Sequence, residues 1–134
     1  MKNSVTVKAY CKINLSLDIK GVRSDGKHEV DMCMQSIPLH DVVEVRRFPS
    51  CKREIKLKAN AEWVPTDSRN TAYKAAELLI KDFPQIECGT EIIIDKRVPG
   101  CGGLGGSSSD AAGVLLGMND LYDLGITLEE MQKY

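Results

Sequence analysis

The glycine-serine stretch P-G-C-G-G-L-G-G-S-S-S-D-A-A, residues 99–112, constrains this chain more than any other segment. Five of the seven residues from Gly100 to Gly106 are glycine. Glycine lets a backbone approach a ligand closely and adopt left-handed conformations. A strand-like run precedes the stretch and an apolar helical pattern follows it. The sequence therefore predicts a loop that directs backbone N–H groups, and the positive end of a helix dipole, at an anion such as a phosphate.

Two common nucleotide motifs fit this stretch poorly. A Walker A loop needs a lysine where Gly106 stands. The pattern G-x-G-x-x-G is met by Gly100, Gly102 and Gly105, but a helical segment follows where a second strand ending in an acidic residue is required. A flexible loop, or a glycine-lined contact between helix and sheet, is the alternative without a ligand.

The rest of the pattern predicts a single α+β domain over residues 1–134, with a mixed or antiparallel sheet covered by helices. Ile13, Leu15, Leu17 and Ile19 alternate with polar residues, which predicts a half-buried strand with Asn14 and Ser16 on its other face. Further strands are predicted over 30–37, 42–48, 55–57 and 91–95. Helices are predicted over 72–83 and 107–122, with a third beginning at a capping box of Thr127 and Glu130.

Composition excludes several classes of function. A net charge of −1 provides no basic surface for nucleic acid. No apolar run approaches the roughly 20 residues of a membrane helix, so no membrane partner is expected. The five cysteines are odd in number and widely spaced, and with two histidines they indicate neither a disulfide framework nor a metal centre. We expect reduced thiols in a cytoplasmic protein, several of them in the core.

Four segments in order resemble motifs of the GHMP kinases, a family of ATP-dependent small-molecule kinases. They are C-K-I-N-L-S-L-D-I, R-S-D-G-K-H-E-V-D-M-C-M-Q-S-I-P-L-H-D, D-S-R-N-T-A-Y-K-A-A-E-L-L and the loop with its flanks, I-D-K-R-V-P-G-C-G-G-L-G-G-S-S-S-D-A-A. The resemblance implies a ribosomal protein S5 domain 2-like fold, ATP with Mg²⁺ as cofactors, and a bacterial cytoplasmic enzyme. The second segment implies a particular small-molecule substrate, a cytidine diphosphate-linked methylerythritol phosphorylated on its 2-hydroxyl.

The same resemblance implies roles for individual residues. Lys12 is the catalytic lysine near the γ-phosphate, and Asn14, Lys27 and His28 contact the substrate. Lys27 departs from the family, which has a tyrosine that packs on the cytosine there. No side chain is assigned as a metal ligand. The residues implied in ATP binding are Asn70, Lys96, Pro99, Gly102, Gly103, Leu104, Gly105, Gly106, Ser107, Ser108 and Ser109.

Each role has a plainer alternative. Lys12 and Lys96 could be solvated lysines, His28 an exposed loop residue and Asn70 a helix cap; Asp110 fits the helix dipole alone. At the level of function, the alternatives are another GHMP kinase and a non-catalytic nucleotide-binding domain of the same fold. A homodimer is left open. The resemblance places the general base, an aspartate, shortly after Tyr134, so little turnover is expected from residues 1–134 alone.

Overall fold

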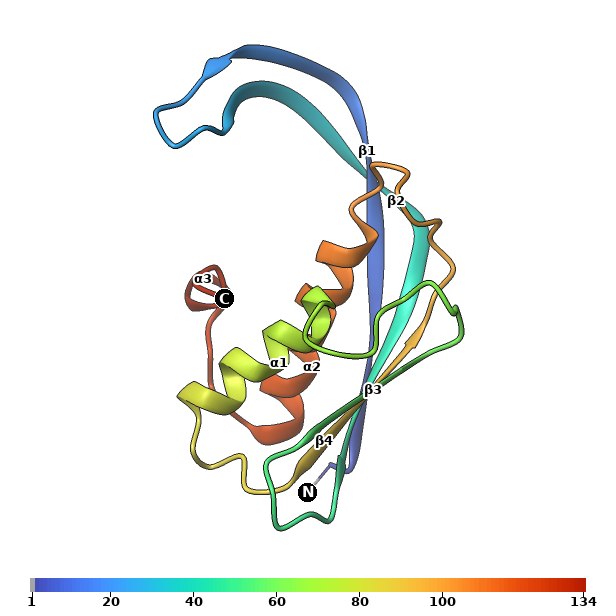
Figure 1. Cartoon of the computed structure of the whole chain (residues 1–134), viewed down its shortest axis with the longest axis vertical. Coiled ribbons are helices and arrows are strands. Elements are labelled where there is room, and N and C mark those ends of the chain that lie inside the picture. The colour runs from blue at the N-terminus through green and yellow to red at the C-terminus, as the bar shows by residue number, and fades with distance from the viewer. Residues whose placement is uncertain (1) are drawn as a thin grey trace.

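The computed structural model describes residues 2–134 and contains a four-stranded sheet with two long helices on one face (Figure 1). The strand order is β1-β2-β4-β3. β1 pairs with β2, and β2 with β4, in antiparallel fashion, whereas β3 and β4 are parallel. This arrangement confirms the predicted α+β class and mixed sheet. The elements are β1 (Ser4–Val22), β2 (His28–Phe48), β3 (Ile55–Ala59), α1 (Thr71–Asp82), β4 (Gly89–Asp95), α2 (Gly106–Tyr122) and α3 (Leu128–Met131).

Alternate residues of the strands bury one face of the sheet beneath α1 and α2. Val45 on β2 pairs with Ile92 on β4, which pairs in turn with Leu57 on β3, and all three are buried. The intervening residues, such as Lys56 and Lys58 on β3, are charged and lie on the other face. Removing each large aliphatic side chain from water contributes about 1.5–3 kcal/mol, so this face is the core.

Capping signals in the sequence correctly located two helix starts. The Asn70 side chain accepts a hydrogen bond of 2.9 Å from the Ala72 N–H at the start of α1. Thr127 and Glu130 form the predicted capping box of α3, each side chain accepting from the backbone N–H of the other. These bonds satisfy donors that a helix start leaves without partners.

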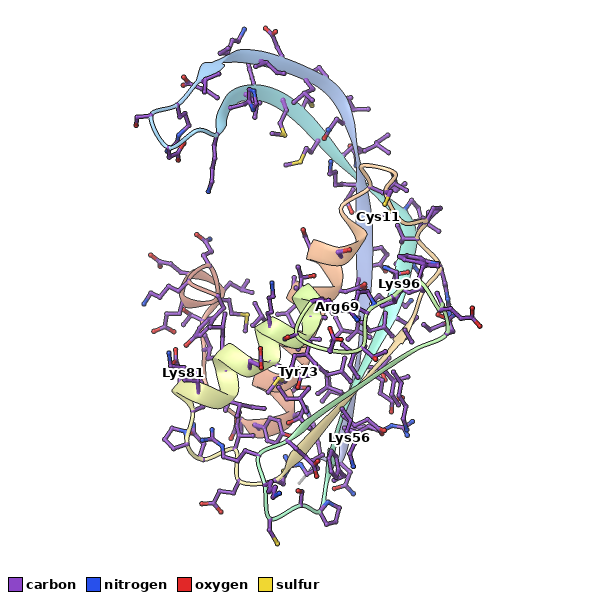
Figure 2. All side chains as sticks on the ribbon, in the orientation of Figure 1. Cys11, Lys56, Arg69, Tyr73, Lys81 and Lys96 are labelled. Atoms are coloured by element: carbon purple, nitrogen blue, oxygen red, sulfur yellow. The ribbon has the colours of Figure 1, made fainter. Side chains whose placement is uncertain are left out.

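Beyond Lys12, β1 and β2 leave the sheet as a two-stranded arm, residues 13–37, that curls over the side on which the helices lie (Figure 1). Its side chains stand clear of the helices (Figure 2). Leu15, Leu17 and Ile19 are 54–61% exposed, so the prediction of a half-buried strand is wrong for this segment. A pair of strands with no third layer has nothing to pack against.

The predicted division of β1 into an apolar and a polar face is also wrong. Asn14 pairs with Met34, whereas Leu17 pairs with Met32, so β1 uses three residues where β2 uses two. The extra residue is a β-bulge around Leu15, which moves the side chains from Ser16 to Ile19 to the opposite face; a further shift between Ile19 and Gly21 restores the original alternation. Leu17 therefore shares the face of Asn14 instead of opposing it.

A second irregularity lies within a strand that the sequence analysis predicted as two. The segments predicted over 30–37 and 42–48 form the single strand β2, which contains Pro38. Tyr10 pairs with His40 and Lys12 with Ser36, so β2 uses four residues where β1 uses two. Proline has no N–H for the ladder, and the extra residues accommodate it at the base of the arm.

The cysteines agree with one expectation from composition and contradict another. All five cysteines are free, as predicted, but only Cys11, at the base of the arm (Figure 2), is fully buried. Cys33, Cys51 and Cys101 are exposed, so the expectation that several cysteines lie in the core is wrong. Among residues 2–134, none of the helices is both long enough and apolar enough to cross a membrane.

Candidate functional site

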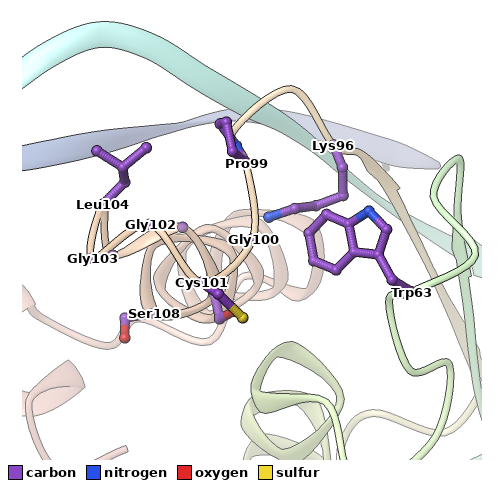
Figure 3. A pocket seen from close by; sticks show the side chains of 12 residues that line it. Trp63, Lys96, Pro99, Gly100, Cys101, Gly102, Gly103, Leu104 and Ser108 are labelled. Atoms are coloured by element: carbon purple, nitrogen blue, oxygen red, sulfur yellow. The ribbon is translucent and has the colours of Figure 1, made fainter.

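The glycine loop runs from the end of β4 to the start of α2, as the sequence predicts. Cys101, Gly103 and Gly105 have positive φ angles of 59°, 67° and 72°. Gly105 is the N-cap of α2 and provides no side-chain acceptor, so the first N–H groups of the helix are left for a ligand. Figure 3 shows the loop lying across the end of α2. The positive end of the helix dipole therefore faces the space that the loop surrounds.

Two adjoining pockets lie at this loop. The first, of about 140 Å³, is lined by residues 99–108 together with Lys96 and Trp63. The second, of about 240 Å³, extends to the start of α1 and includes Asn70 and Asp110. Lys96, Trp63 and Ser107 line both pockets. Every residue that the sequence analysis assigns to ATP, except Ser109, lines one of the two.

Ser109 is used by the fold instead. Its hydroxyl donates a hydrogen bond of 2.6 Å to the Tyr10 carbonyl on β1. A hydroxyl has one proton to donate, so Ser109 anchors α2 to the sheet and its donor is not available to a phosphate. Ser107 and Ser108 are the two serines of the stretch that face the pocket.

Asn70 is a helix cap that also lines the second pocket. Besides capping α1, its amide nitrogen donates a hydrogen bond of 2.8 Å to the Pro65 carbonyl. One amide hydrogen and one oxygen lone pair remain after these two bonds. Asn70 is therefore a helix cap, as the plainer alternative states. Its side chain can still donate one hydrogen bond to a ligand and accept one from it.

Lys12 and Asn14 lie beside the glycine loop. The Lys12 N–H donates a hydrogen bond of 3.0 Å to the Leu104 carbonyl, and its Nζ donates one of 3.0 Å to the Asn14 Oδ1. A Cβ on Gly105 would lie only 3.4 Å from the Lys12 Cε. The Lys12 side chain therefore lies next to the start of α2.

The other two predicted substrate residues lie at the far end of the arm. His28 pairs with Val22 near the tip, and Lys27 is in the turn before it. By the alternation of β2, His28 shares the face of Met34 and hence of Asn14 and Lys12. The structure thus puts Lys12, Asn14 and His28 on one face of the arm, with His28 apart from the glycine loop.

A buried ionic cluster supports the loop from behind. The Lys96 Nζ lies 2.5 Å from the Asp41 Oδ2 and 2.8 Å from the Asp110 Oδ2, and none of the three side chains is more than 5% exposed. The alternative of a solvated Lys96 is therefore wrong. The Lys96 ammonium also lies 5.8 Å from the centre of the Trp63 ring, beside which the side chain runs in Figure 3.

The two carboxyl groups of the cluster have opposite pKa shifts. Burial alone raises the pKa of Asp41, but hydrogen bonds from Lys96 and from the Val98 and Arg97 amides lower it overall. Burial raises the pKa of Asp110 to about 6, and its hydrogen bond to Lys96 offsets only part of this effect. The pKa of Lys96 is raised because both carboxylates outweigh its burial. Two acids share one cation here, and the ionised form of Asp110 is less stabilised than the ionised form of Asp41.

Sequence reasoning missed three features of this site. Asp41 is the last residue of the second quoted segment. It pairs with Ala9 on β1 and precedes Val43 by two residues, so it is an acid on the buried face of β2. This position on a buried face was the only sign of its role. Asp110 was ascribed to the helix dipole, and its bond to Lys96 was not anticipated. Trp63 lies in a loop with no periodic pattern and gave no signal.

Comparison with known proteins agrees with this geometry. The family model "GHMP kinases N terminal domain" matches residues 70–134. A 4-diphosphocytidyl-2-C-methyl-D-erythritol kinase of Clostridium botulinum is 48% identical over 125 residues, which are 93% of this chain and 43% of that protein. One from Acetivibrio thermocellus is 50% identical over 121 residues, covering 90% of this chain and 41% of that protein. The chain thus spans less than half the length of these relatives.

Solved structures give the same result. A crystal structure of 4-(cytidine 5'-diphospho)-2C-methyl-D-erythritol kinase matches with a TM-score of 0.76 and 32% identity over 96% of this chain and 45% of that one. Homoserine kinase from Cytophaga hutchinsonii has a TM-score of 0.71 at 23% identity, covering 98% of this chain and 39% of that one, and so shares the fold. The chain therefore carries the N-terminal domain of the GHMP kinases and belongs to that family.

Proposed function

We propose that residues 1–134 are the ATP- and substrate-binding domain of a kinase that phosphorylates the 2-hydroxyl of 4-diphosphocytidyl-2-C-methyl-D-erythritol. The observation that carries this proposal is the hydrogen bond of 3.0 Å from the Lys12 N–H to the Leu104 carbonyl. It brings a lysine on β1 to the start of α2, where a phosphate is stabilised by free N–H groups and the helix dipole. The bacterial relatives, which are kinases named for this compound, support the choice of substrate.

In this proposal the glycine loop holds the ATP phosphates and Lys12 acts on the group being transferred. The substrate hydroxyl oxygen forms a bond to the γ-phosphorus, the bond to the β-phosphate oxygen breaks, and ADP leaves. The hydroxyl proton passes to a general base, which the resemblance assigns to an aspartate outside these residues. Such reactions are catalysed mainly by positioning and by cations on the phosphate oxygens, which is the chemistry that Lys12 offers.

Magnesium would arrive with ATP, on its phosphate oxygens, where it neutralises their charge. The carboxylates of Asp41 and Asp110 flank the loop, but both are bonded to the Lys96 ammonium. They are therefore poorly suited to a metal site made only of protein ligands, and no side chain is assigned to the ion.

The substrate would lie along the face of the arm that carries Lys12, Asn14 and His28. Leu17 and Met32 lie between the two ends of that face and provide apolar contact area. Lys27 lacks the aromatic ring of the family residue, although its stem can cover a base and its ammonium can pair with a phosphate.

Calorimetric titration with a non-hydrolysable ATP analogue, followed by a cytidine diphosphate ligand, tests the proposal. We expect the chain to bind both. Lys12→Met should weaken binding of the ATP analogue, because a cation at the loop is lost. Lys8→Met is the matched control, since Lys8 is an exposed lysine on the same strand. Absence of ATP-analogue binding by the unmodified chain would contradict the proposal.

The cytidine ligand separates the remaining alternatives. Another GHMP kinase, or a non-catalytic nucleotide-binding domain of this fold, would bind the ATP analogue without binding the cytidine compound. A phosphoryl-transfer assay with the same protein should give little turnover, since the base is assigned elsewhere. Full activity from residues 1–134 would contradict that assignment.

A further inference from the structure

Asp41, Lys96 and Asp110 form a buried cluster, here called the clasp, that links the two ends of the glycine loop. Lys96 is at the beginning of the loop, Asp110 is on α2 one turn after the helix starts, and Asp41 comes from β2. The three residues are far apart in sequence, and their ionic contacts tie three elements of the fold at one point.

The clasp also holds backbone groups. The Asp41 Oδ1 accepts hydrogen bonds of 2.5 Å and 2.8 Å from the N–H groups of Arg97 and Val98. Residues 96–98 are thus fixed to β2 immediately before the glycines begin. The middle of the loop is fixed by the bond from Lys12 to Leu104.

The Lys96 ammonium is already committed within the clasp. Two of its three N–H donors go to carboxylates, and its side chain is 5% exposed. A lysine held in this way is poorly placed to reach a phosphate by its ammonium. Within the part of the chain that the structure describes, the Asp110 Oδ1 is buried and has no hydrogen-bond partner, so the clasp is not fully satisfied.

The geometry points to a positioning role: Asp41 and Asp110 hold Lys96 at the base of the glycine loop and thereby set the loop's N–H groups for a nucleotide phosphate before the nucleotide binds. For its ligand this inference rests on the proposed function. It explains why Lys96, a lysine beside an anion pocket, is paired with two carboxylates.

Charge alone and positioning predict opposite effects of losing Asp110 on nucleotide affinity. Two carboxylates and one ammonium leave a net negative charge next to a pocket for an anion, so neutralising Asp110 would strengthen nucleotide binding by simple electrostatics. Positioning predicts weaker binding instead. The direction of the change in affinity therefore distinguishes the two.

Asp110→Asn is the test variant, because asparagine keeps the shape and loses the charge. Asp95→Asn is the matched control, since Asp95 precedes Lys96 directly but forms an exposed pair with Arg97. Binding of a non-hydrolysable ATP analogue is followed by the emission of Trp63, the single tryptophan of the chain, which lines both pockets. We expect about tenfold weaker binding for Asp110→Asn, as for other groups that support a binding site. Equal or tighter binding would overturn the inference.

A measurement without nucleotide tests the same inference independently. The Lys12 amide is protected only while Leu104 stays in place, and the Val98 amide only while Asp41 holds it. Hydrogen exchange at these two amides, resolved by NMR, should be faster in Asp110→Asn than in Asp95→Asn. Unchanged protection at Lys12 in folded Asp110→Asn would contradict the clasp. If instead the unmodified chain fails to bind the ATP analogue, the proposed function fails and exchange still decides this inference.

Acidification of the unmodified chain provides a test that needs no variant. The charged groups that face Asp110 are Lys96 and Asp41; Arg69, in the turn before α1, lines the same pocket but is paired with Asp67. Because burial raises the pKa of Asp110 to about 6, acid should neutralise it and remove its ionic contact with Lys96. We expect Trp63 emission to change with a midpoint near this pKa in the unmodified chain and in Asp95→Asn, and to lose that change in Asp110→Asn. Both histidines are present in all three proteins, so a transition that persists in Asp110→Asn would contradict the inference.

Discussion

The Lys12 N–H and the Leu104 carbonyl are joined by a hydrogen bond of 3.0 Å, so β1 and the glycine loop form one unit. The bond lies where β1 leaves the sheet to enter the arm. A displacement of the loop therefore moves the backbone that carries the proposed catalytic lysine. The loop and Lys12 must be tested together, because neither keeps its geometry without the other.

Gly105→Ala should therefore impair both the loop and Lys12. An alanine at a positive φ costs about 1 kcal/mol, and here its Cβ would also contact the Lys12 side chain at 3.4 Å. Gly103→Ala is the matched control, because Gly103 has a similar φ but nothing within 4 Å of its Cβ position. Urea unfolding and ATP-analogue titration should show similar losses of stability, with the larger loss of affinity in Gly105→Ala. Equal affinities for the two variants would show that the contact with Lys12 has no role.

Local patterns in the sequence correctly predict much of this fold and the position of the glycine loop. The helix that starts at the glycine loop, the caps at Asn70 and Thr127, and the strand that carries Lys12 all follow from short-range rules of periodicity and capping. The motif spacing also correctly associates Lys12 with Asn14, whose side chains are hydrogen-bonded.

The features that were missed depend on long-range pairing. Lys96 has the pattern of a solvated strand end, and only the fold brings Asp41 and Asp110 to its ammonium. The faces of the arm depend on the bulge near Leu15, which exists only relative to β2. Neither a buried ion cluster between separate elements nor a register shift leaves a periodic signal in one chain.

The stability of the chain should depend on the protonation of Asp110. Its pKa is raised from 3.8 to about 6, so the folded state binds this proton more tightly than the unfolded state does. This group therefore makes the free energy of unfolding rise as the pH falls from about 6 towards 3.8. Urea unfolding at several pH values should show this slope in the unmodified chain and a loss of it in Asp110→Asn.

Asp67 is the control for this measurement, because its shift has the opposite sign. Hydrogen bonds from Arg69 lower its pKa from 3.8 to about 2, so its contribution is present above 3.8 and is lost only as the pH falls towards 2. Asp67→Asn should leave the slope above pH 4 unchanged. An unchanged slope in Asp110→Asn would mean that Asp110 titrates normally in the folded chain.

The arm should tolerate polar substitutions that the core cannot. Leu17 is 54% exposed, whereas Leu79 on α1 is fully buried. Leu17→Ser should change the free energy of unfolding by less than about 0.5 kcal/mol, as at other surface sites. Leu79→Ala should cost about 2–5 kcal/mol through the cavity that it leaves. Both values come from urea unfolding, and a large loss in Leu17→Ser would mean that the arm packs against the rest of the chain.

Asn70 offers a test that separates capping from nucleotide binding. Its side-chain oxygen accepts from the Ala72 N–H, so Asn70→Ala should cost about 1 kcal/mol of stability. Asn70→Ser keeps a cap acceptor but loses the amide, whose remaining hydrogen is available in the second pocket. We expect Asn70→Ser to unfold like the unmodified chain in urea and to bind the ATP analogue more weakly. If Asn70→Ser binds the analogue with unchanged affinity, Asn70 serves only as the cap of α1, and the contacts to ATP in that pocket must come from its other residues.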